Sequence, residues 1–449
     1  MLYVQCVRPA VEDCIKYCST MAQRLDALIF GASGFTGKYT VKELALIAKE
    51  KPITWGVAGR SEEKLKSVLE EMSKKTGVDL SSVKIVTADI NDEESLKQMT
   101  AQAKVIINCC GPYRFLGEPV IKACIATATH HVDVSGEPQY MERMQLEYNK
   151  AAQDAGVYIV SACGFDSVPC DLGIVYLQDK FDGVVNSVET YLQTKAKTDV
   201  GGARIHYGTW ESAVYGLAHA NELRPLRTKL YPERLPQFKP KLKSLPKFCK
   251  SAIVNNAWVL PFLGADKAVA SRSQRYFFDH DKKRPVQIAT YFSVPSFFGV
   301  MLMGFFGMIF ALLTKFNFGR YLLLKHPKLF SAGFASHEGP AEEVMQNTHF
   351  SITLVGKGWT SDKTLAEPTD QISEPLNKTV ITKVSGVNPG YGFTCIALIL
   401  CGMTMLKEAD KMPQNGGVYP PGAAFAKTSL IQELHKHCLT FEVVSVKEE

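Results

Sequence analysis

The sequence predicts an α/β protein whose first part is a doubly wound parallel sheet. Over the first 165 residues, short apolar runs rich in β-branched residues alternate with amphipathic helical patterns. A glycine-rich turn, GASGFTG at 31–37, lies between the first apolar run and the first helical pattern. Continuous apolar strands separated by helices are typical of a parallel sheet covered on both faces, with ligands at the carboxyl ends of the strands.

The strands follow one another at regular intervals, and each is followed by a helical segment. The predicted strands are 25–30, 53–59, 83–89, 105–111, 130–136 and 157–164. The clearest helical segments are 38–50, 61–75 and 118–129. With 449 residues, the chain has room for roughly two to three domains.

The turn after the first strand has the glycine spacing of a dinucleotide-binding loop. Gly31 permits a tight turn, Gly34 lets the backbone approach a pyrophosphate, and Gly37 lets the helix pack closely on the sheet. The helix that follows offers free N–H groups and a positive dipole to phosphates. Glycines in such a loop also occur without any ligand, but the strand–turn–helix context favours the binding site. The predicted contacts are Gly31, Ser33, Gly34, Phe35, Thr36 and Gly37.

The second strand ends in Ala-Gly-Arg60-Ser61, without the acidic residue that usually binds the ribose of NAD. The guanidinium of Arg60 can pair with a 2′-phosphate, and Ser61 and Lys64 can add contacts. NADP(H) is therefore the predicted cofactor. Asp89, at the end of the third strand, is placed to meet the adenine amino group or to cap a helix.

The later strand ends carry polar groups at the same edge of the sheet. The turn Cys110-Gly111-Pro112-Tyr113 should face the ribose and nicotinamide. For a proton that accompanies hydride transfer, the candidate donors are Tyr113, His206, Glu137 and Asp166. Each acid could instead be a helix cap or part of a turn. His130, His131 and Asp133 alternate along a strand without a fourth ligand, so no metal is predicted.

Composition restricts the possible binding partners and the cellular compartment. The net charge of +6 comes from scattered Lys and Arg, which argues against nucleic-acid binding. The twelve cysteines form no CxxC pair, which favours a reducing intracellular compartment. Residues 1–23 lack the apolar core of a secretory signal and are interpreted as an N-terminal extension.

Several longer motifs, taken in order, resemble those of one family. GASGFTG, VAGRSEEKL, NCCGPYRFLGEPVIKAC, DVSGEPQ, GFDSVPCDLG and NPGYGFTCIALIL are similar to the saccharopine dehydrogenase-like oxidoreductases. The resemblance implies a Rossmann domain over 24–165 that is completed by 385–449. It also implies an α+β second domain with a mixed sheet over 166–384, and similarity to bacterial trans-acting enoyl reductases. Saccharopine itself would need convergent arginines, and only Arg204, Arg224 and Arg227 stand out in the second domain.

An apolar segment interrupts the second domain. Residues 291–313 contain 23 residues without a charge, flanked on both sides by basic residues. As a helix this segment would be roughly 34 Å long, enough to cross a bilayer. A single crossing would separate the two parts of the Rossmann domain, so the sequence favours a re-entrant hairpin or a helix lying in the interface. The predicted membrane-associated segment is 291–325.

The leading hypothesis is an intracellular NADP(H)-dependent reductase that acts on a lipid-like or other apolar small molecule. We expect it on lipid droplets, with the endoplasmic reticulum or a mitochondrial membrane as alternatives. A second hypothesis is a dinucleotide-binding sensor or scaffold without turnover, and a third is an amino-acid oxidoreductase. A homodimer is compatible with the sequence, which does not settle the oligomeric state.

Overall fold

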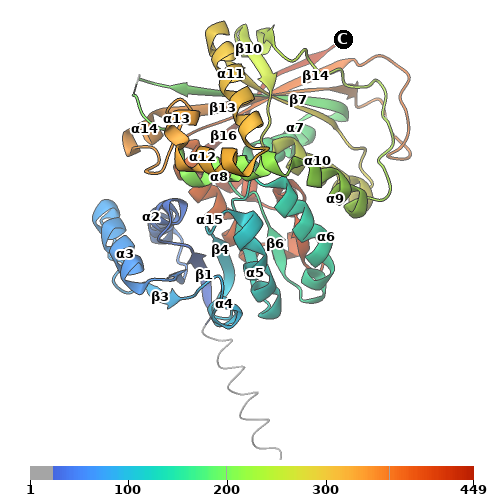
Figure 1. Ribbon diagram of the computed structural model, residues 1–449. Helices are drawn as coiled ribbons and strands as arrows, with labels where there is room; N and C mark the ends of the chain where they lie inside the picture. The colour runs from blue at the N-terminus through green and yellow to red at the C-terminus, as the bar shows by residue number, and fades with distance from the viewer. Residues whose placement is uncertain (1–23, 199, 364) are drawn as a thin grey trace, which may run out of the picture.

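The computed structural model describes residues 24–198, 200–363 and 365–449, so the N-terminal extension lies outside the described residues. The chain forms two seven-stranded sheets, one in each half of the molecule, with helices between and around them (Figure 1). The α/β class and the mixed second sheet, both expected from the sequence, are confirmed.

The first sheet is wholly parallel, in the order β15-β6-β5-β4-β1-β2-β3. Its strands are β1 (Leu25–Phe30), β2 (Trp55–Gly59), β3 (Lys84–Thr87), β4 (Ala103–Asn108), β5 (His130–Asp133), β6 (Tyr158–Val160) and β15 (Gly417–Tyr419). Strands β2 and β3 are added on one side of β1, and β4, β5 and β6 on the other. Dinucleotides bind at the point where the strand order switches in this way, here between β1 and β4. All six strands predicted from the sequence are present, several of them one to a few residues shorter.

Helices cover both faces of this sheet. They are α2 (Phe35–Glu50), α3 (Glu62–Thr76), α4 (Glu93–Thr100), α5 (Tyr113–Ala126), α6 (Pro138–Asp154) and α15 (Thr394–Lys407). Helix α16 (Pro421–Phe425) follows β15, and α17 (Leu430–His437) packs on α15. Alternate residues of β1 serve the two faces: Ala27 and Ile29 join the core under α2 and α15, whereas Leu28 and Phe30 join that under α4 and α5. Helix α15 thus brings the C-terminal part back to the first domain, as the resemblance implied.

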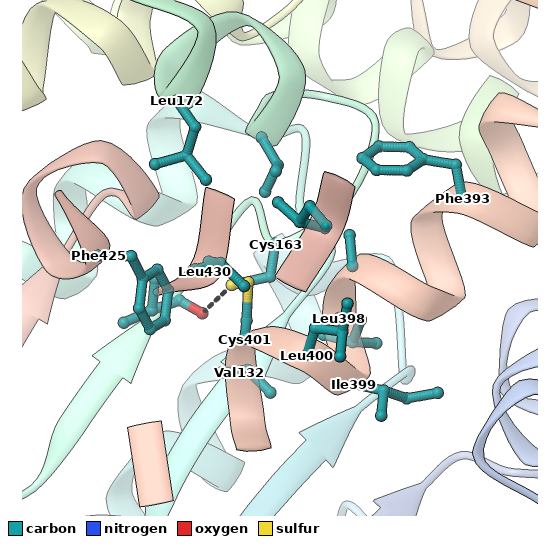
Figure 2. Packing of buried hydrophobic residues seen from close by; sticks show 14 of the residues in the cluster. Val132, Cys163, Leu172, Phe393, Leu398, Ile399, Leu400, Cys401, Phe425 and Leu430 are labelled. Atoms are coloured by element: carbon teal, nitrogen blue, oxygen red, sulfur yellow. Dashed lines mark hydrogen bonds between the residues drawn. The ribbon is translucent and has the colours of Figure 1, made fainter. Parts of the chain in front are cut away.

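The core around α15 is tightly packed. Figure 2 shows the thiols of Cys163 and Cys401 close together among the side chains of Val132, Leu398 and Leu400. The Cys163 thiol donates to the carbonyl oxygen of Val160, 3.4 Å away. Together with the apolar residues of α15, this core fixes the strand ends on which the site is built.

The second sheet is mixed, in the order β16-β14-β13-β7-β11-β10-β9. Its strands are β7 (Gly183–Ala196), β9 (Cys249–Ser251), β10 (Ala257–Pro261), β11 (Gln287–Val294), β13 (Thr348–Thr360), β14 (Lys378–Val387) and β16 (Leu439–Glu448). Only the β7–β11 pair is parallel. Along most of β14, buried and partly exposed residues alternate, because one face of the sheet packs on α7 (Val168–Lys180) and the other points outward.

The end of the chain differs from the expected domain boundary. Residues 385–449 do not all return to the first domain, because β16 pairs with β14 at the edge of the second sheet. Leu439 and Phe441, both buried, alternate with exposed residues and so give β16 the pattern of a strand with one covered face. The segment therefore serves both domains.

The remaining α-helices and short strands belong to the second domain. They are α8 (Tyr207–Ala218), α9 (Leu223–Leu230), α10 (Asp266–Asp281), α11 (Phe297–Leu313), α12 (Asn317–Lys325), α13 (Pro327–Phe330), α14 (Glu342–Asn347) and the short strands β8 (Ile205–His206) and β12 (Ala335–Ser336). Helix α8 packs on α12 and α11 and lies close to the first domain (Figure 1).

The apolar segment is not a single helix over 291–313. Residues 291–294 complete β11, and α11 begins at Phe297, after Pro295, with Ser296 as its cap: the Ser296 hydroxyl accepts from the Gly299 N–H at 3.1 Å. The helix has 17 residues, about 25 Å in length. Among the described residues, only Pro389–Lys407 has the length and hydropathy of a membrane span, and 72% of it is buried inside the protein.

Candidate functional site

The glycine turn after β1 has the geometry of a phosphate-binding loop. Gly31 has a φ of +79°, and a Cβ there would lie 2.6 Å from the sulfur of Cys110. A Cβ on Gly37 would lie 2.1 Å from the Gly31 carbonyl oxygen. Both positions therefore require glycine. Ser33 and Gly34 are exposed at the tip, and no side chain caps the N-terminus of α2, so its amides can receive an anion.

Arg60 is exposed at the carboxyl end of β2, beside this turn. Burial raises the pKa of the Cys110 thiol to about 12, and the nearby charge of Arg60 opposes that shift. Arg60, Cys110 and Gly31 thus lie at one edge of the sheet, as the NADP(H) prediction requires. The guanidinium is free to meet a 2′-phosphate.

Three further predicted cofactor residues have structural partners. Ser61 caps α3 by accepting the Lys64 N–H at 3.3 Å, and the Lys64 side chain is exposed. Asp89 accepts the Asn91 N–H at 2.9 Å, and the cap of α4 is Asp92. Asp89 therefore belongs to a turn, and its adenine contact stays a prediction.

His206 of the second domain stacks on Phe35 of the glycine turn. The ring centroids are 4.6 Å apart and the planes are inclined by 15°. The His206 N–H donates to the Tyr391 hydroxyl at 2.9 Å, and the Tyr391 ring meets Phe35 edge-on at 4.7 Å. Burial lowers the pKa of His206, which favours the neutral imidazole. His206 of the second domain therefore covers the start of α2.

Tyr113 and Glu137 form an anchor for α5. The buried Tyr113 hydroxyl donates to the Asn108 carbonyl at 2.9 Å, and burial raises its pKa well above the ordinary value. The Glu137 carboxylate accepts the N–H groups of Tyr113 and Arg114, both at 3.0 Å, and the hydroxyl of Ser212 at 2.9 Å. Burial raises the pKa of Glu137 against these hydrogen bonds. Glu137 therefore joins β5, α5 and α8.

Asp166 lies where the loops after β5 and β6 meet α10. Its carboxylate accepts the Ala265 N–H at 3.2 Å and the Ser167 hydroxyl at 3.3 Å. It is partly exposed and lies beside Asp266, which is 4% exposed. Burial raises the pKa of both acids, and repulsion by Asp166 adds to the shift of Asp266. The two carboxyls together favour a bound proton.

Sequence reasoning missed Asp266 and Ser212, which complete the surroundings of two predicted residues. Asp266 is the first residue of α10 and follows the short apolar strand β10. An acid directly after Gly264-Ala265, between a strand and a helix, is the pattern that could have identified it. Ser212 had no local signal, because its partner Glu137 is far away in the sequence. The structure thus brings the glycine turn, Arg60 and Cys110 together, and places Asp166 at the domain boundary.

His131 and Asp133 are buried within the first domain. The His131 Nε2 contacts the Asn108 amide at 3.2 Å, and burial lowers the pKa of His131 to about 3. Asp133 accepts the Ser161 hydroxyl at 2.8 Å, and its pKa is raised to about 7 by burial. Among the residues that the structure describes, no three His, Cys, Asp or Glu side chains are grouped to hold a metal ion.

Two open hollows lie away from the glycine turn. One of about 790 Å³ is lined by polar residues of the second sheet, including Lys195, His349 and Lys383. The other, of about 760 Å³, lies between α7, α17 and Arg284. Neither is lined by a predicted cofactor residue, so the candidate site rests on the geometry of the strand ends.

A doubly wound sheet with this turn, Arg60 at the second strand end and a second domain over the site defines a dinucleotide-binding protein. Residues 27–160 match the model of the saccharopine dehydrogenase NADP binding domain. The saccharopine dehydrogenase-like oxidoreductase of Mus musculus is 42% identical over 429 residues, which cover 94% of this chain and 97% of that protein. The chain therefore belongs to the saccharopine dehydrogenase-like oxidoreductases, and its cofactor is NADP(H).

Other similarities extend this result. A Caenorhabditis elegans protein named lipid droplet localized protein is 36% identical, covering 94% of this chain and 99% of that protein. A Mycobacterium tuberculosis protein named as a trans-acting enoyl reductase is 36% identical over 170 residues, 37% of this chain and 39% of that protein. The saccharopine dehydrogenase (L-Glu forming) of Saccharomyces cerevisiae shares the fold, with a TM-score of 0.51 and 15% identity over 94% of this chain and all of that one.

Proposed function

We propose that the protein is an NADP(H)-dependent reductase that works on a lipid surface and reduces a lipid-like substrate. The observation that carries the proposal is the exposure of α11, an apolar helix in which only Val300 is buried. Phe298 is 76% exposed, Met308 65% and Met301 59%. A continuous apolar face of this kind is typical of an interaction site, and here of a helix lying in a lipid interface.

The position of α11 supports an in-plane helix. Its beginning contacts β11, and it also contacts α8 and α12, so the helix stays attached to one body of the protein. Residues 285–337 contain no Asp or Glu, whereas Lys315, Arg320, Lys325 and Lys328 follow the helix. Basic residues beside an apolar helix favour the head-group region of a membrane. The C. elegans relative named for lipid droplets supports the same location.

Helix α8 joins the apolar surface to the dinucleotide turn. On one face, the Trp210 indole N–H donates to the Leu323 carbonyl at 2.9 Å, and its ring lies 4.8 Å from that of Phe310. On the other face, Ser212 binds Glu137, and His206 caps the helix start over Phe35. An apolar substrate that leaves the lipid near α11 would therefore approach the NADP(H) site along α8.

This chain's residues would divide the chemistry as follows. The turn Gly31–Gly37 would hold the pyrophosphate and Arg60 the 2′-phosphate, and the cofactor, when bound, would supply the hydride. Asp166 is the proposed proton donor, because its carboxyl is partly exposed beside the buried Asp266 and burial raises the pKa of both acids. Solvent can restore that proton after each turnover. The M. tuberculosis relative named as an enoyl reductase supports an unsaturated lipid as substrate.

A non-catalytic sensor is the second candidate, and a specific observation favours it. Two of the four predicted donors are used for structure, since the Tyr113 hydroxyl bonds to the main chain and Glu137 caps α5. An amino-acid substrate has less support. Arg204 bonds to the Val200 carbonyl at 3.0 Å and Arg227 pairs with Glu142 at 2.7 Å, so these two arginines are engaged separately.

The test is consumption of NADPH by the full-length protein bound to phospholipid vesicles that contain long-chain enoyl and carbonyl lipids. We expect lipid-dependent oxidation of NADPH, with kcat lowered about 10²-fold or more in Asp166→Asn and NADPH affinity retained. Glu70→Gln, an exposed acid of α3, serves as the control. Tight NADPH binding without oxidation of any lipid would favour the sensor.

A further inference from the structure

A lysine-rich segment, 239–250, crosses the outer face of the second sheet. Lys241, Lys243, Lys247 and Lys250 are exposed, whereas Leu242 and Leu245 pack against the cluster that contains Tyr191 and Tyr291. The segment is held at two points: the Leu242 N–H donates to the Gln287 side chain and the Leu245 N–H to the Tyr291 hydroxyl, both at 2.9 Å. The lysines are therefore presented outward by a fixed backbone.

The segment leads directly to the apolar helix. It continues into β9, which pairs with β10. The Lys250 ammonium lies 5.6 Å from the Trp258 ring, and the Trp258 ring lies 5.2 Å from that of Phe297, at the start of α11. Phe248 and Phe297 are 57% and 52% exposed. The basic and apolar surfaces thus adjoin, and β10 and α11 lie side by side in Figure 1.

The charge of this surface is not balanced nearby in the sequence. Residues 234–265 contain no Asp or Glu. Within the described part of the chain, none of the four lysines forms an ion pair with a carboxylate, whereas Lys66 and Lys150 of the first domain do. A basic patch beside an apolar helix is complementary to an interface that combines acyl chains with anionic head groups.

We propose that the lipid-binding surface includes segment 239–250 and the β9–β10 hairpin, and that it selects surfaces containing anionic phospholipids. The inference rests on the proposed lipid-surface function and adds which lipid surfaces the protein selects. Helix α11 inserts its apolar side chains, and the lysines meet the head groups around it. Each lysine close to such a surface adds about fivefold in affinity, and the effect disappears at high ionic strength.

The test compares Lys243→Gln/Lys247→Gln/Lys250→Gln with the wild type in sedimentation with vesicles. The vesicles are pure phosphatidylcholine, or phosphatidylcholine with about a third of phosphatidylserine, at low and high salt. We expect the wild type to prefer the anionic vesicles at low salt, and the triple variant to lose about a hundredfold in affinity for them. Its affinity for neutral vesicles should not change. The matched control, Lys66→Gln/Lys97→Gln/Lys150→Gln, removes equal charge from exposed sites of the first domain and should bind like the wild type.

Equal binding of the wild type to both vesicles would overturn the inference and leave the lipid-surface function standing. An equal loss in the triple variant and the control would also overturn it, because net charge and not this surface would then decide. If the wild type binds neither vesicle, the lipid-surface function itself fails. Circular dichroism of each variant excludes loss of folding as the cause.

Discussion

Gly31 and Gly37 hold β1 and α2 so close together that a side chain at either position would meet other atoms of the turn. This requirement is local, and the sequence therefore predicts it well. The role of Arg60 is equally predictable from the sequence, because the residue at the end of the second strand faces the ribose in this fold. In contrast, hydrogen-bond partners of Asp166 and Glu137 come from the start of α10 and from α8. These partners are distant in the sequence, so no local pattern predicts them.

Replacing Arg60 tests the assignment of the 2′-phosphate. Arg60→Ala removes an exposed guanidinium, so folding should be unaffected, while NADPH affinity falls by about 10- to 100-fold through the loss of a charge-assisted contact. Isothermal titration with NADPH and NADH measures both effects. NADH affinity should stay the same, and Lys97→Ala, an exposed cation of α4, provides the control. An equal loss for the two nucleotides would place Arg60 elsewhere in the site.

Asp133 gives the protein a characteristic pH dependence. Its pKa is raised to about 7 by burial, whereas an unfolded Asp releases its proton near 3.8. Between these values the folded state binds the extra proton, so the free energy of unfolding should fall as the pH rises from about 4 to 7, by about 4 kcal/mol for this group. Asp171, raised to about 6 by burial, acts in the same direction.

Asp133→Asn should flatten this dependence, because the amide does not titrate. Denaturant unfolding at several pH values between about 4 and 7 measures the slope for the wild type and the variant. The Asp171 contribution remains in both proteins. An unchanged slope would show that Asp133 is already ionised at low pH.

At the scale of elements, the apolar run 291–313 divides into the end of β11 and helix α11. Charge-free runs do not distinguish a buried strand from a helix by hydropathy alone. The β-branched and aromatic residues along 287–294 and Pro295 were the local signals, since such residues favour strands and proline disfavours helix in the residue before it. The exposure of α11, however, depends on which neighbours cover it, and only the assembled structure gives that.

The exposed side chains of α11 should dominate binding to lipid. In Phe298→Ser/Met301→Ser/Met308→Ser, each change removes apolar contact of about 1.5–3 kcal/mol, so vesicle affinity should fall at least 100-fold. Thermal stability should change little, because these side chains are mostly exposed. Leu46→Ser/Leu146→Ser/Val444→Ser, on α2, α6 and β16, is the control, and co-sedimentation with vesicles is the measurement. An equal fall in the control would refute a specific role of α11.

At the scale of the molecule, the two domains share one chain in an interleaved order. Helix α15 and β15 return to the first domain, and β16 then joins the second sheet beside β14. The family motifs predict the return, but the pairing of β16 depends on a partner strand some 60 residues earlier and has no local signature. Between the domains, α8 contacts both the dinucleotide turn and the exposed apolar helix α11, so it connects the predicted cofactor site with the proposed lipid-binding surface.

The most direct measurement follows NADPH absorbance while full-length protein, on vesicles containing enoyl and carbonyl lipids, is mixed with the cofactor. We expect oxidation of NADPH that requires both the lipid acceptor and the vesicle surface, and that is lost in Asp166→Asn and in the α11 variant. Oxidation that proceeds equally without vesicles would contradict the lipid-surface function. Tight binding of NADPH with no oxidation under any of these conditions would contradict the reductase and leave a dinucleotide sensor.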